Sequence, residues 1–514
     1  ARAFVEANAA VFGLTPSLAS LETAAVRQSP AGHHVRFAQQ YEGLPVFNGG
    51  LEVSLDHDNR VVLVQDDCAP VEGFSTSPRL TAAAAARVAE RHFAKTYRFR
   101  KNTRDAFLSK PAGVVRLLEE PEPSLGVYPT AKGPRLAYRL TLVVDDPPAA
   151  QDYLIDARNG KVLRHQSLEQ TAFAPSPQEA FGRAEAVAAG SGDVFDPNPV
   201  NTLNDGTLED NADADYPALA GAYLDRPLPE ITRFLGIYFL VGPYARVTDI
   251  IEAPRNYIFL LGYMPSSSPD FDFRRNDMRF EHVVCYHHID ANQRYIQSLG
   301  FTDVNNRSMM IDPHGLRGAD NAHYLGFPIG AGYIALGDGG VDDGEDADVI
   351  IHEYGHAIQD NQSTGKYLSL TIETGAQGEG FADYWAASST HATSLANGFD
   401  PACVGEWDST SYRNENPPCL RRVDGTKHYP EDLEGQVHAD GEIWSSALWD
   451  LFNTLGKGTA DTLVLQSHFL VPFNPDFSEG AAAILDADAL LFSGANAGAI
   501  CQAFTDRGIA VTGC

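Results

Sequence analysis

The spacing of apolar residues changes several times along the chain, and its first clear pattern has a period of two. Apolar and polar residues alternate along His34–Tyr41 and Leu51–Leu55, which predicts two β-strands that each bury one face. Asn48-Gly-Gly stands between the two runs, and such a sequence is typical of a tight turn. Residues 33–65 therefore predict a meander of antiparallel strands.

A helical period follows this meander. Residues 80–97 are rich in alanine and repeat apolar residues at helical spacing, which predicts an α-helix. Strand-like runs return at residues 135–144, 152–156 and 161–164, and Ala157-Arg-Asn-Gly160 predicts a hairpin turn between the last two. Strands and a helix in this order indicate an α+β arrangement.

Composition then marks a boundary. Residues 166–194 are rich in alanine, proline, serine and glycine, which predicts a linker that proteases can reach. The α+β region before it is long enough for two small units, which we place at residues 1–75 and 76–165. After the linker, mixed strands continue to about residue 340, and mostly helices follow. We place this second boundary so that residues 195–356 and 357–514 form separate lobes.

Charge divides the chain at the same place. Residues 1–170 carry 20 Lys and Arg against 19 Asp and Glu, whereas the remaining residues carry 18 against 49. We therefore expect two parts with different roles. The formal net charge of −30 argues against nucleic acid as a natural partner, because phosphates would be repelled. No apolar run approaches the roughly 18 residues that predict a membrane span.

The six cysteines predict two disulfides. Four of them form two pairs that each bracket a short segment, namely Cys403 with Cys419 and Cys501 with Cys514. Neither pair has the close spacing of a structural zinc site, so we expect a disulfide in each, which implies an oxidising compartment. The other two, Cys68 and Cys285, are predicted to be buried free thiols.

The segment His352-Glu353-Tyr-Gly-His356 carries the candidate chemistry. On a helix, residues four apart share a face, so the two imidazoles can bind one metal ion. Glu353 is one residue further on, where it can hold a water at the metal without being a ligand. By itself the pattern is only moderately specific, since a surface helix with scattered histidines would also produce it.

A second acidic pair completes this pattern. Glu379 and Asp383 are four residues apart in a segment whose aromatic residues predict a buried helix. Glu379 is the natural third zinc ligand, and Asp383 can accept a hydrogen bond from a ligand histidine. Its alternative is a carboxylate on a helix surface, which the apolar neighbours make less suitable because a buried acid needs a partner.

These segments together resemble the gluzincin peptidases, and Gly378-Glu-Gly resembles the fungalysin branch in particular. The resemblance covers roughly residues 195–514, and the region around Tyr41–Gly50 is similar to the propeptide of the same peptidases. Further segments carry it as well: Asp320–Tyr324, Gly337–Gly340 and Asp348, Leu420–Arg422, and Val437–Trp444.

This resemblance implies a fold and a function. The expected fold is an α+β propeptide region followed by a thermolysin-like catalytic domain, with a mixed β/α lobe at residues 195–356 and a mainly helical lobe at residues 357–514. The expected function is that of a secreted zinc endopeptidase that cleaves proteins or peptides. It would be made as a zymogen, inhibited by its own propeptide and processed within residues 166–194.

The resemblance also assigns roles to individual residues. Glu353 would be the general base, and His438 would donate to the oxyanion, although a histidine in the core is an equal alternative without the resemblance. Arg421 would hold a substrate carbonyl, with a surface ion pair as its alternative. Asn321 and Ala322 would bind the peptide backbone or form a plain turn.

Two departures from the family pattern affect these roles. Leu370 falls near the place where thermolysin-like enzymes carry a tyrosine, so His438 could be the oxyanion donor by itself. The thermolysin calcium ligands do not carry over beyond Asp348. The acidic run Asp342–Asp348 could bind calcium through its oxygen ligands, or it could be a solvated loop. His287 and His288 belong to a predicted helix without a second motif, and we expect them to be structural.

Three other functions stay open at this stage. An aminopeptidase can carry the same zinc ligands, but its Gly-Ala-Met-Glu-Asn segment for the free amine is not in this sequence. The second function is that of a binding protein on an inactive peptidase scaffold. The complete set of metal ligands and the base argue against it. A stored complex in which the N-terminal region acts as inhibitor is a third, and it agrees with the zymogen.

Overall fold

The computed structural model describes most of the chain as two compact units. The first comprises residues 1–27 and 32–171, and the second comprises residues 28–31 and 172–514. The residues whose structure is described are 1–12, 14, 20–71, 73–96, 123–130, 132–145, 148–167, 186–249, 263–326, 332–363, 365–367, 371–413 and 415–514. The mixture of helices and strands is that of an α+β protein, as the sequence predicts.

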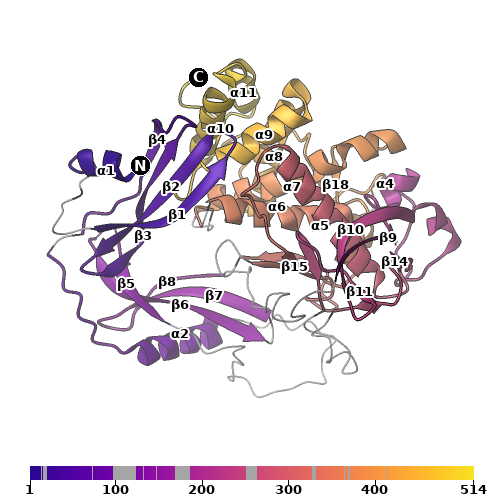
Figure 1. The fold of residues 1–514 in the computed structure, drawn as a ribbon, viewed down its shortest axis with the longest axis horizontal. Helices are drawn as coiled ribbons and strands as arrows, with labels where there is room; N and C mark the ends of the chain where they lie inside the picture. Colours follow the sequence, from indigo (N-terminus) through magenta and orange to yellow (C-terminus); the bar gives the residue numbers. More distant parts are fainter. Residues whose placement is uncertain are drawn as a thin grey trace. The chain divides into compact units, whose positions relative to one another are not determined.

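The first unit is built on an eight-stranded sheet with the order β1-β2-β3-β5-β6-β7-β8 and with β4 paired to β3 (Figure 1). The bounds of its elements are α1 Arg2–Ala7, β1 Ser20–Ser29, β2 Gly32–Tyr41, β3 Leu44–Leu55, β4 Val61–Asp66, α2 Ala82–Thr96, β5 Ser124–Tyr128, β6 Arg135–Asp145, β7 Pro148–Asp156 and β8 Val162–Ser167.

Helices cover two parts of this sheet. Helix α2 packs on β6 and β7, where Ala89 and Phe93 lie in a buried cluster with Leu140. Helix α1 contributes Val5 to a separate cluster with Phe37 from β2. The two parts are joined where β3 pairs with β5, and smaller buried clusters lie near this junction.

The turn between β2 and β3 differs from the prediction at Asn48-Gly-Gly. The chain reverses at Glu42 and Gly43, which both have positive φ, at 49° and 78°. This geometry suits a two-residue hairpin, because its twist matches that of the strands. The segment Asn48–Gly50 lies inside β3 instead, and a Cβ on Gly50 would lie 2.4 Å from the Phe37 carbonyl oxygen. Gly50 therefore permits the close contact between β3 and β2, because a side chain at this position would clash.

The predicted linker also needs a correction. Part of it is strand β9, Ala186–Val194, which pairs antiparallel with β10, Leu224–Phe234. A Cβ on Gly190 would lie 2.3 Å from the Pro269 carbonyl oxygen, so this glycine again permits close packing. Glycine and alanine therefore indicate tight contacts here as well as flexibility. Residues 166–167 end strand β8, and residues 168–185 of the predicted linker lie outside the described residues.

The second unit contains two main sheets, with the orders β13-β11-β10-β9-β14 and β12-β15-β17-β16. The bounds of the remaining strands are β11 Ile237–Phe239, β12 Ala245–Val247, β13 Pro265–Ser266, β14 Asp270–Phe271, β15 Met309–Asp312, β16 His323–Leu325, β17 Tyr333–Ala335, β18 Cys403–Val404 and β19 Arg421–Arg422.

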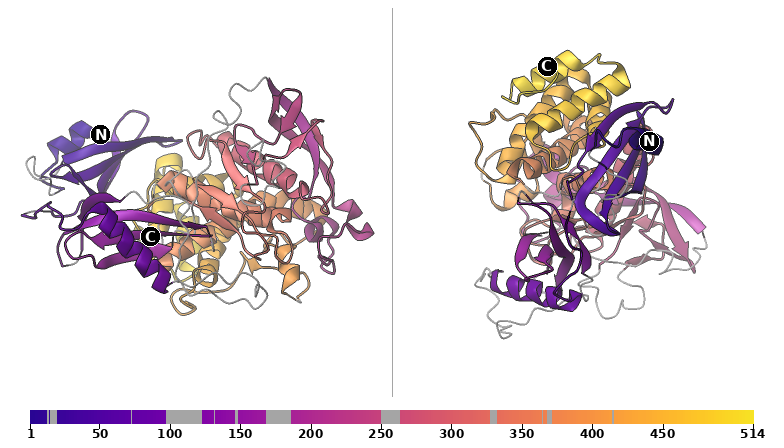
Figure 2. Two further views of the ribbon diagram at one scale, coloured as in Figure 1. Left: turned by 90° about the horizontal axis from the view of Figure 1, so that it is seen from below. Right: turned by 90° about the vertical axis from the view of Figure 1, so that its left-hand side faces the viewer.

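Helices make up most of the rest of this unit. The α-helices are α4 Pro199–Leu203, α5 Phe280–Ser298, α6 Ala347–Ser363, α7 Ile372–Asn397, α8 Val437–Leu455, α9 Lys457–Ser467, α10 Phe477–Phe492 and α11 Ala497–Thr505, and the short 3₁₀ helices are η1 Pro217–Gly221, η3 Asp343–Glu345 and η4 Asp408–Ser411. Within this unit, helices α5 to α7 lie between the five-stranded sheet and the C-terminal helices (Figures 1 and 2).

Small residues allow the central helices to approach closely. A Cβ on Gly355 of α6 would lie 2.9 Å from the Ala382 Cα of α7. A Cβ on Gly380 of α7 would lie 2.4 Å from the Gly441 carbonyl oxygen of α8. A larger residue at either glycine would force the helices apart. This packing brings three helices together at one place.

Both predicted disulfides are confirmed. Cys403 is bonded to Cys419 and Cys501 to Cys514, while Cys285 is a buried free thiol and Cys68 is a partly buried one. Each pair lies close in sequence, so local spacing was sufficient to predict it. Within the described ranges, no helix has the length and apolar character needed to cross a membrane.

Candidate metal centre

Helix α6 carries His352 and His356 one turn apart, with Glu353 directly after His352. The two imidazole centroids lie 4.9 Å apart, as the i,i+4 spacing predicts. His352 and Glu353 are buried, whereas His356 is partly exposed. Helix α7 adds Glu379, whose Oε2 lies 3.2 Å from His352 Nε2 and 3.5 Å from His356 Nε2. Three ligand atoms from two helices therefore converge on one point.

A carboxylate fixes the orientation of one histidine. Asp383 is fully buried one turn after Glu379, and its Oδ1 lies 2.8 Å from His352 Nδ1. Since a carboxylate only accepts, Nδ1 carries the proton and donates it to Asp383. His352 Nε2 is therefore the ring nitrogen that faces Glu379 and that could bind a metal ion.

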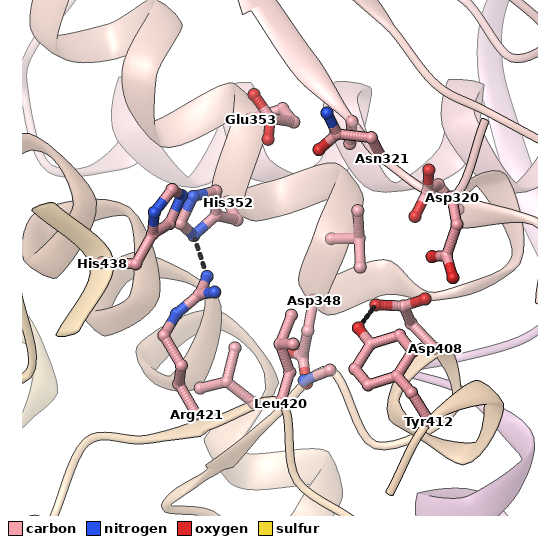
Figure 3. A pocket seen from close by; sticks show the side chains of 15 residues that line it. Asp320, Asn321, Asp348, His352, Glu353, Asp408, Tyr412, Leu420, Arg421 and His438 are labelled. Carbon is pink, nitrogen blue, oxygen red and sulfur yellow. Dashed lines mark hydrogen bonds between the residues drawn. The ribbon is translucent and has the colours of Figure 1, made fainter. Parts of the chain in front are cut away.

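Arg421 of β19 stabilises this carboxylate. Its Nε donates to Asp383 Oδ2 at 2.6 Å and its Nη2 donates to Oδ1 at 2.8 Å, a bidentate pair. Nη2 also lies 3.4 Å from His352 Nδ1, the contact dashed in Figure 3. Because a guanidinium carries only donors, the Asp383 carboxylate is the group that accepts the hydrogen bond from Nδ1.

The charges of the site perturb its pKa values in opposite directions. Burial alone would lower the pKa of His352, but the Asp383 carboxylate and then Glu379 raise it to about 10. Burial would raise the pKa of Glu379, but the two histidines hold it well below its usual range. Burial likewise opposes the charge on Asp383, and Arg421 and His352 hold its pKa below the usual range. The carboxylates therefore stay ionised.

A cation fits between these ligands. The Glu379 Oε2 atom is buried and has no hydrogen bond of acceptable geometry among the described residues. It lies 3.2 Å from His352 Nε2, and this contact is favourable only with a proton or a metal ion between the two atoms. Two imidazole nitrogens and a carboxylate oxygen are a ligand set that zinc prefers.

Glu353 lines the same cavity, but its hydrogen bond is to strand β16 and not to the metal ligands. Its side chain is buried, and the backbone N–H of Tyr324 in β16 donates to its Oε2. In the order of the described strands, β16 is the last of its sheet. Asn321 and Ala322 come just before this strand and line the cavity with Glu353.

His438 extends from the first turn of α8 toward the same point. Its Nε2 lies 3.4 Å from Glu379 Oε2, and burial lowers its pKa. Gln436 fixes its tautomer, a contact that sequence reasoning missed. The Gln436 Oε1 accepts from Ala439 N at 2.7 Å, so its Nε2 donates to His438 Nδ1 at 2.8 Å. His438 Nε2 consequently carries the proton.

A cavity of about 170 Å³ connects these groups. Figure 3 shows His352, Glu353 and His438 on one side of it and Asp320 and Asp408 on the other. All the predicted site residues except His356, Glu379 and Asp383 line this cavity, and those three lie directly behind it. Leu370, the position of the missing tyrosine, lies outside the described residues.

The acidic run Asp342–Asp348 is not a solvated loop. Asp342, Glu345, Asp346 and Asp348 are all buried. Burial and neighbouring carboxylates raise the pKa of Asp342 to about 8 and that of Asp346 to about 8. His287 and His288 act structurally in α5, where His288 Nε2 lies 2.8 Å from the Phe195 carbonyl oxygen.

Sequence reasoning also missed part of the cavity wall. Asp408 and Tyr412 line the cavity beside Asp343 of the acidic run, although neither of the two belongs to a recognised motif. Asp408 and Tyr412 come from the segment between Cys403 and Cys419, and only their polar character could have indicated a role. Their position depends on how that segment folds over α6.

A helix with two histidines one turn apart, joined by a glutamate from the next helix, defines a class: proteins that offer two imidazoles and a carboxylate to one metal ion. The family comparison agrees with this class. Residues 297–513 match the fungalysin metallopeptidase (M36) family, and residues 21–67 match the fungalysin/thermolysin propeptide motif. The resemblance to fungalysin peptidases with their propeptide is therefore confirmed by matches in both parts of the chain.

Curated relatives have consistent names. Extracellular metalloproteinase 4 of Arthroderma benhamiae is 31% identical over 206 residues, which is 32% of this chain and 30% of the relative. Probable extracellular metalloproteinase 4 of Trichophyton verrucosum is 26% identical over 311 residues, 50% of this chain and 46% of the relative. The chain thus spans less than half the length of these relatives.

Among solved structures, the C-terminal domain of Bacillus megaterium YpeB aligns with 29% of this chain and 56% of its own. Its identity is 14% and its TM-score is 0.18, so it supports no inference about the fold.

Proposed function

We propose that this chain is a secreted zinc endopeptidase that hydrolyses peptide bonds in proteins and is made as an inhibited zymogen. The observation that carries the proposal is the convergence of His352, His356 and Glu379 beside the buried carboxylate of Glu353. The names of the extracellular relatives support the reaction and the secretion. The two disulfides agree with an oxidising compartment.

The chemistry follows from the ligand set. When bound to His352, His356 and Glu379, zinc would acidify a water and polarise the carbonyl of the scissile bond. Glu353 takes a proton from that water and later delivers it to the leaving amine. The Tyr324 N–H on Glu353 Oε2 keeps this carboxylate in place before substrate arrives.

The remaining residues bind the substrate. His438 donates from Nε2 to the oxyanion, because Gln436 holds its other nitrogen as an acceptor. Arg421 approaches a substrate carbonyl while it stays paired with Asp383. Asn321 and Ala322, next to β16, bind the peptide backbone, as an added strand would be bound.

The two predicted lobes belong to the same proposal. A thermolysin-like catalytic domain would have a mixed lobe ending with α6, at residues 195–356, and a helical lobe at residues 357–514. The elements of unit 2 support it, because β9 to β17 precede α6 and helices α7 to α11 follow it.

The N-terminal unit would act as the inhibitor until it is cut off. The propeptide motif at residues 21–67 and the near-neutral charge of residues 1–170 support this role. Activity should appear as the intact chain is cut within residues 166–194. Full activity of an uncut chain would contradict the role of inhibitor.

A calcium ion would be a second, structural metal. Glu281, Asp342 and Glu345 offer carboxylate oxygens within 4.8 Å of one another. Glu345 is paired with Arg275, but Glu281 Oε2 and Asp342 Oδ1 have no hydrogen-bond partner in the described part of the chain. Such oxygens are suitable ligands for Ca²⁺. A melting temperature that does not change with added Ca²⁺ would contradict this site.

The test of the main proposal combines metal analysis with proteolysis. The full chain should contain one zinc and digest casein, and a chelator should remove both the metal and the activity. Digestion of an N-terminally blocked peptide would distinguish an endopeptidase from an aminopeptidase. A chain with zinc that cleaves no protein or peptide would instead be an inactive scaffold.

A further inference from the structure

Three carboxylates lie together at the end of the cavity that faces away from the metal ligands. Asp320, Asp343 and Asp408 each offer an oxygen within 4.8 Å of the other two. Asp343 and Asp408 are 2% and 4% exposed, whereas Asp320 is open to solvent. We call this group, together with Tyr412, the acidic pocket (Figure 3).

The acidic pocket is not neutralised by an ion pair among the described residues, and the Arg421 charge only partly opposes the rise in the pKa of Asp408. Tyr412 donates its hydroxyl to Asp408 Oδ2 at 2.7 Å, and the Gly337 N–H donates to Asp343 Oδ2 at 3.2 Å. Asp408 Oδ1 is buried and has no partner among the described residues. No lysine or arginine in that part of the chain forms an ion pair with any of the three carboxylates.

Burial and mutual repulsion make these charges costly without a cation. Burial raises the pKa of Asp408 to about 6, and repulsion from Asp320 adds to this effect. Burial and the Asp408 charge raise the pKa of Asp343 well above its usual range. A positive charge placed among them would relieve both effects.

Apolar side chains share the lining of the cavity with the carboxylates. Val349, Val404 and Leu420 contribute them, and polar residues such as Asn321 and Asp348 complete the wall. A cavity that combines apolar side chains with carboxylates matches a side chain with an aliphatic stem and a cationic head, as in lysine and arginine. A metal ion bound by the carboxylates would make no favourable contact with the apolar side chains.

We propose that the acidic pocket binds the side chain of a lysine or arginine directly beside the scissile bond. The proposal rests on the proposed peptidase function, because the same cavity is lined by His352, Glu353 and His438. The peptide backbone would lie along the metal-side wall, and its cationic side chain would extend to Asp408 and Asp343. Substrates would thus be selected by charge rather than by apolar size alone.

The test is a cleavage profile of the zinc-loaded full chain on a library of blocked peptides. We expect lysine and arginine to be enriched at one of the two positions next to the cut, with kcat/KM about 10-fold or more above leucine. A profile with no basic preference at either position would overturn the proposal. If no peptide is cut at all, the proposed peptidase function itself fails.

Variants locate the preference in the acidic pocket. Asp408→Asn should lower the lysine-to-leucine ratio of kcat/KM by about 10-fold or more, whereas Asp408→Glu should restore part of it. Glu415→Gln is the matched control, because it also removes one negative charge, but from a side chain that is 69% exposed. An equal ratio in Asp408→Asn and the control would refute the assignment.

A metal ion in the acidic pocket is the competing outcome. If Ca²⁺ occupied it, added Ca²⁺ would suppress cleavage beside lysine or arginine more than cleavage beside leucine at the same position, or abolish the preference. The acidic pocket would be assigned to the metal if three results came together. The parent chain would bind Ca²⁺, Asp408→Asn would not, and the cleavage profile would show no basic preference. The lysine-to-leucine ratio measured with and without Ca²⁺ therefore separates the two.

Discussion

Asp383→Asn should loosen the metal centre without removing a ligand. Asp383 is fully buried, accepts the His352 Nδ1 proton at 2.8 Å, and receives two hydrogen bonds from Arg421. An asparagine is nearly isosteric but neutral, and its amide group can donate to Nδ1. That donation would favour the tautomer with a proton on Nε2, which cannot bind a metal ion.

The contacts of Asp383 give two expected magnitudes, one for zinc affinity and one for the free energy of unfolding. Loss of the hydrogen bond behind a ligand histidine typically weakens metal binding roughly 10- to 100-fold, or about 1.4 to 2.7 kcal/mol. Arg421 also loses the charge that it pairs with, and breaking a buried pair costs about 3–5 kcal/mol. The Arg421 side chain is 15% exposed, so water compensates in part and we expect about 3 kcal/mol in unfolding free energy.

The assay is a zinc competition against a chelator of known affinity, combined with a denaturant titration of the metal-free chain. Asp461→Asn is the matched control, because Asp461 is equally buried in α9 and pairs with Lys457 away from the metal ligands. The control should lose stability but keep its zinc affinity. If Asp383→Asn bound zinc within about 2-fold of the parent, the tautomer argument would be wrong.

Other predictions follow from single contacts. Glu353→Gln should keep the zinc but lower kcat by roughly 10² or more, because only the base is lost; near-normal casein digestion would contradict this. His438→Ala should lower kcat by roughly 10² with a smaller effect on KM, and an unchanged kcat would remove it from the mechanism. Burial lowers the pKa of His314, but Asp338 at 2.8 Å and Glu281 raise it from 6.5 to about 10. The charged His314 ring therefore contributes its full stabilising free energy below pH 6.5 and loses it as the pH rises to about 10. Melting temperatures measured from pH 7 to 10 should fall less steeply in His314→Gln than in the parent chain.

Local spacing was enough to predict the parts of this protein that follow from one helix or one short segment. His352 and His356 share a face because a helix repeats every 3.6 residues, and this periodicity is written in the sequence. The disulfide partners Cys403 and Cys419 are only 16 residues apart, so their pairing needed no knowledge of the fold. The mixed pattern of strands and helices predicted the fold class for the same reason.

Glycine was the least reliable local signal. Asn48-Gly-Gly and the glycines near residue 190 predicted a turn and a linker, but both belong to strands. A missing side chain permits a turn, and it equally permits close contact with another backbone. Only the neighbouring strand determines which of the two occurs.

The tertiary structure alone decided what surrounds the metal ligands. Asp383 and Arg421 are 38 residues apart, and Asp343 and Asp408 come from separate segments, yet each pair meets in the folded chain. Gln436 orients His438 as the local N-cap of α8, but only the packing of α8 on α7 brings His438 to Glu379. Such contacts depend on how close α6, α7 and α8 pack and on how the disulfide-bonded segment folds over them. No periodicity in the sequence encodes those distances, because they arise from the packing of elements that are far apart along the chain.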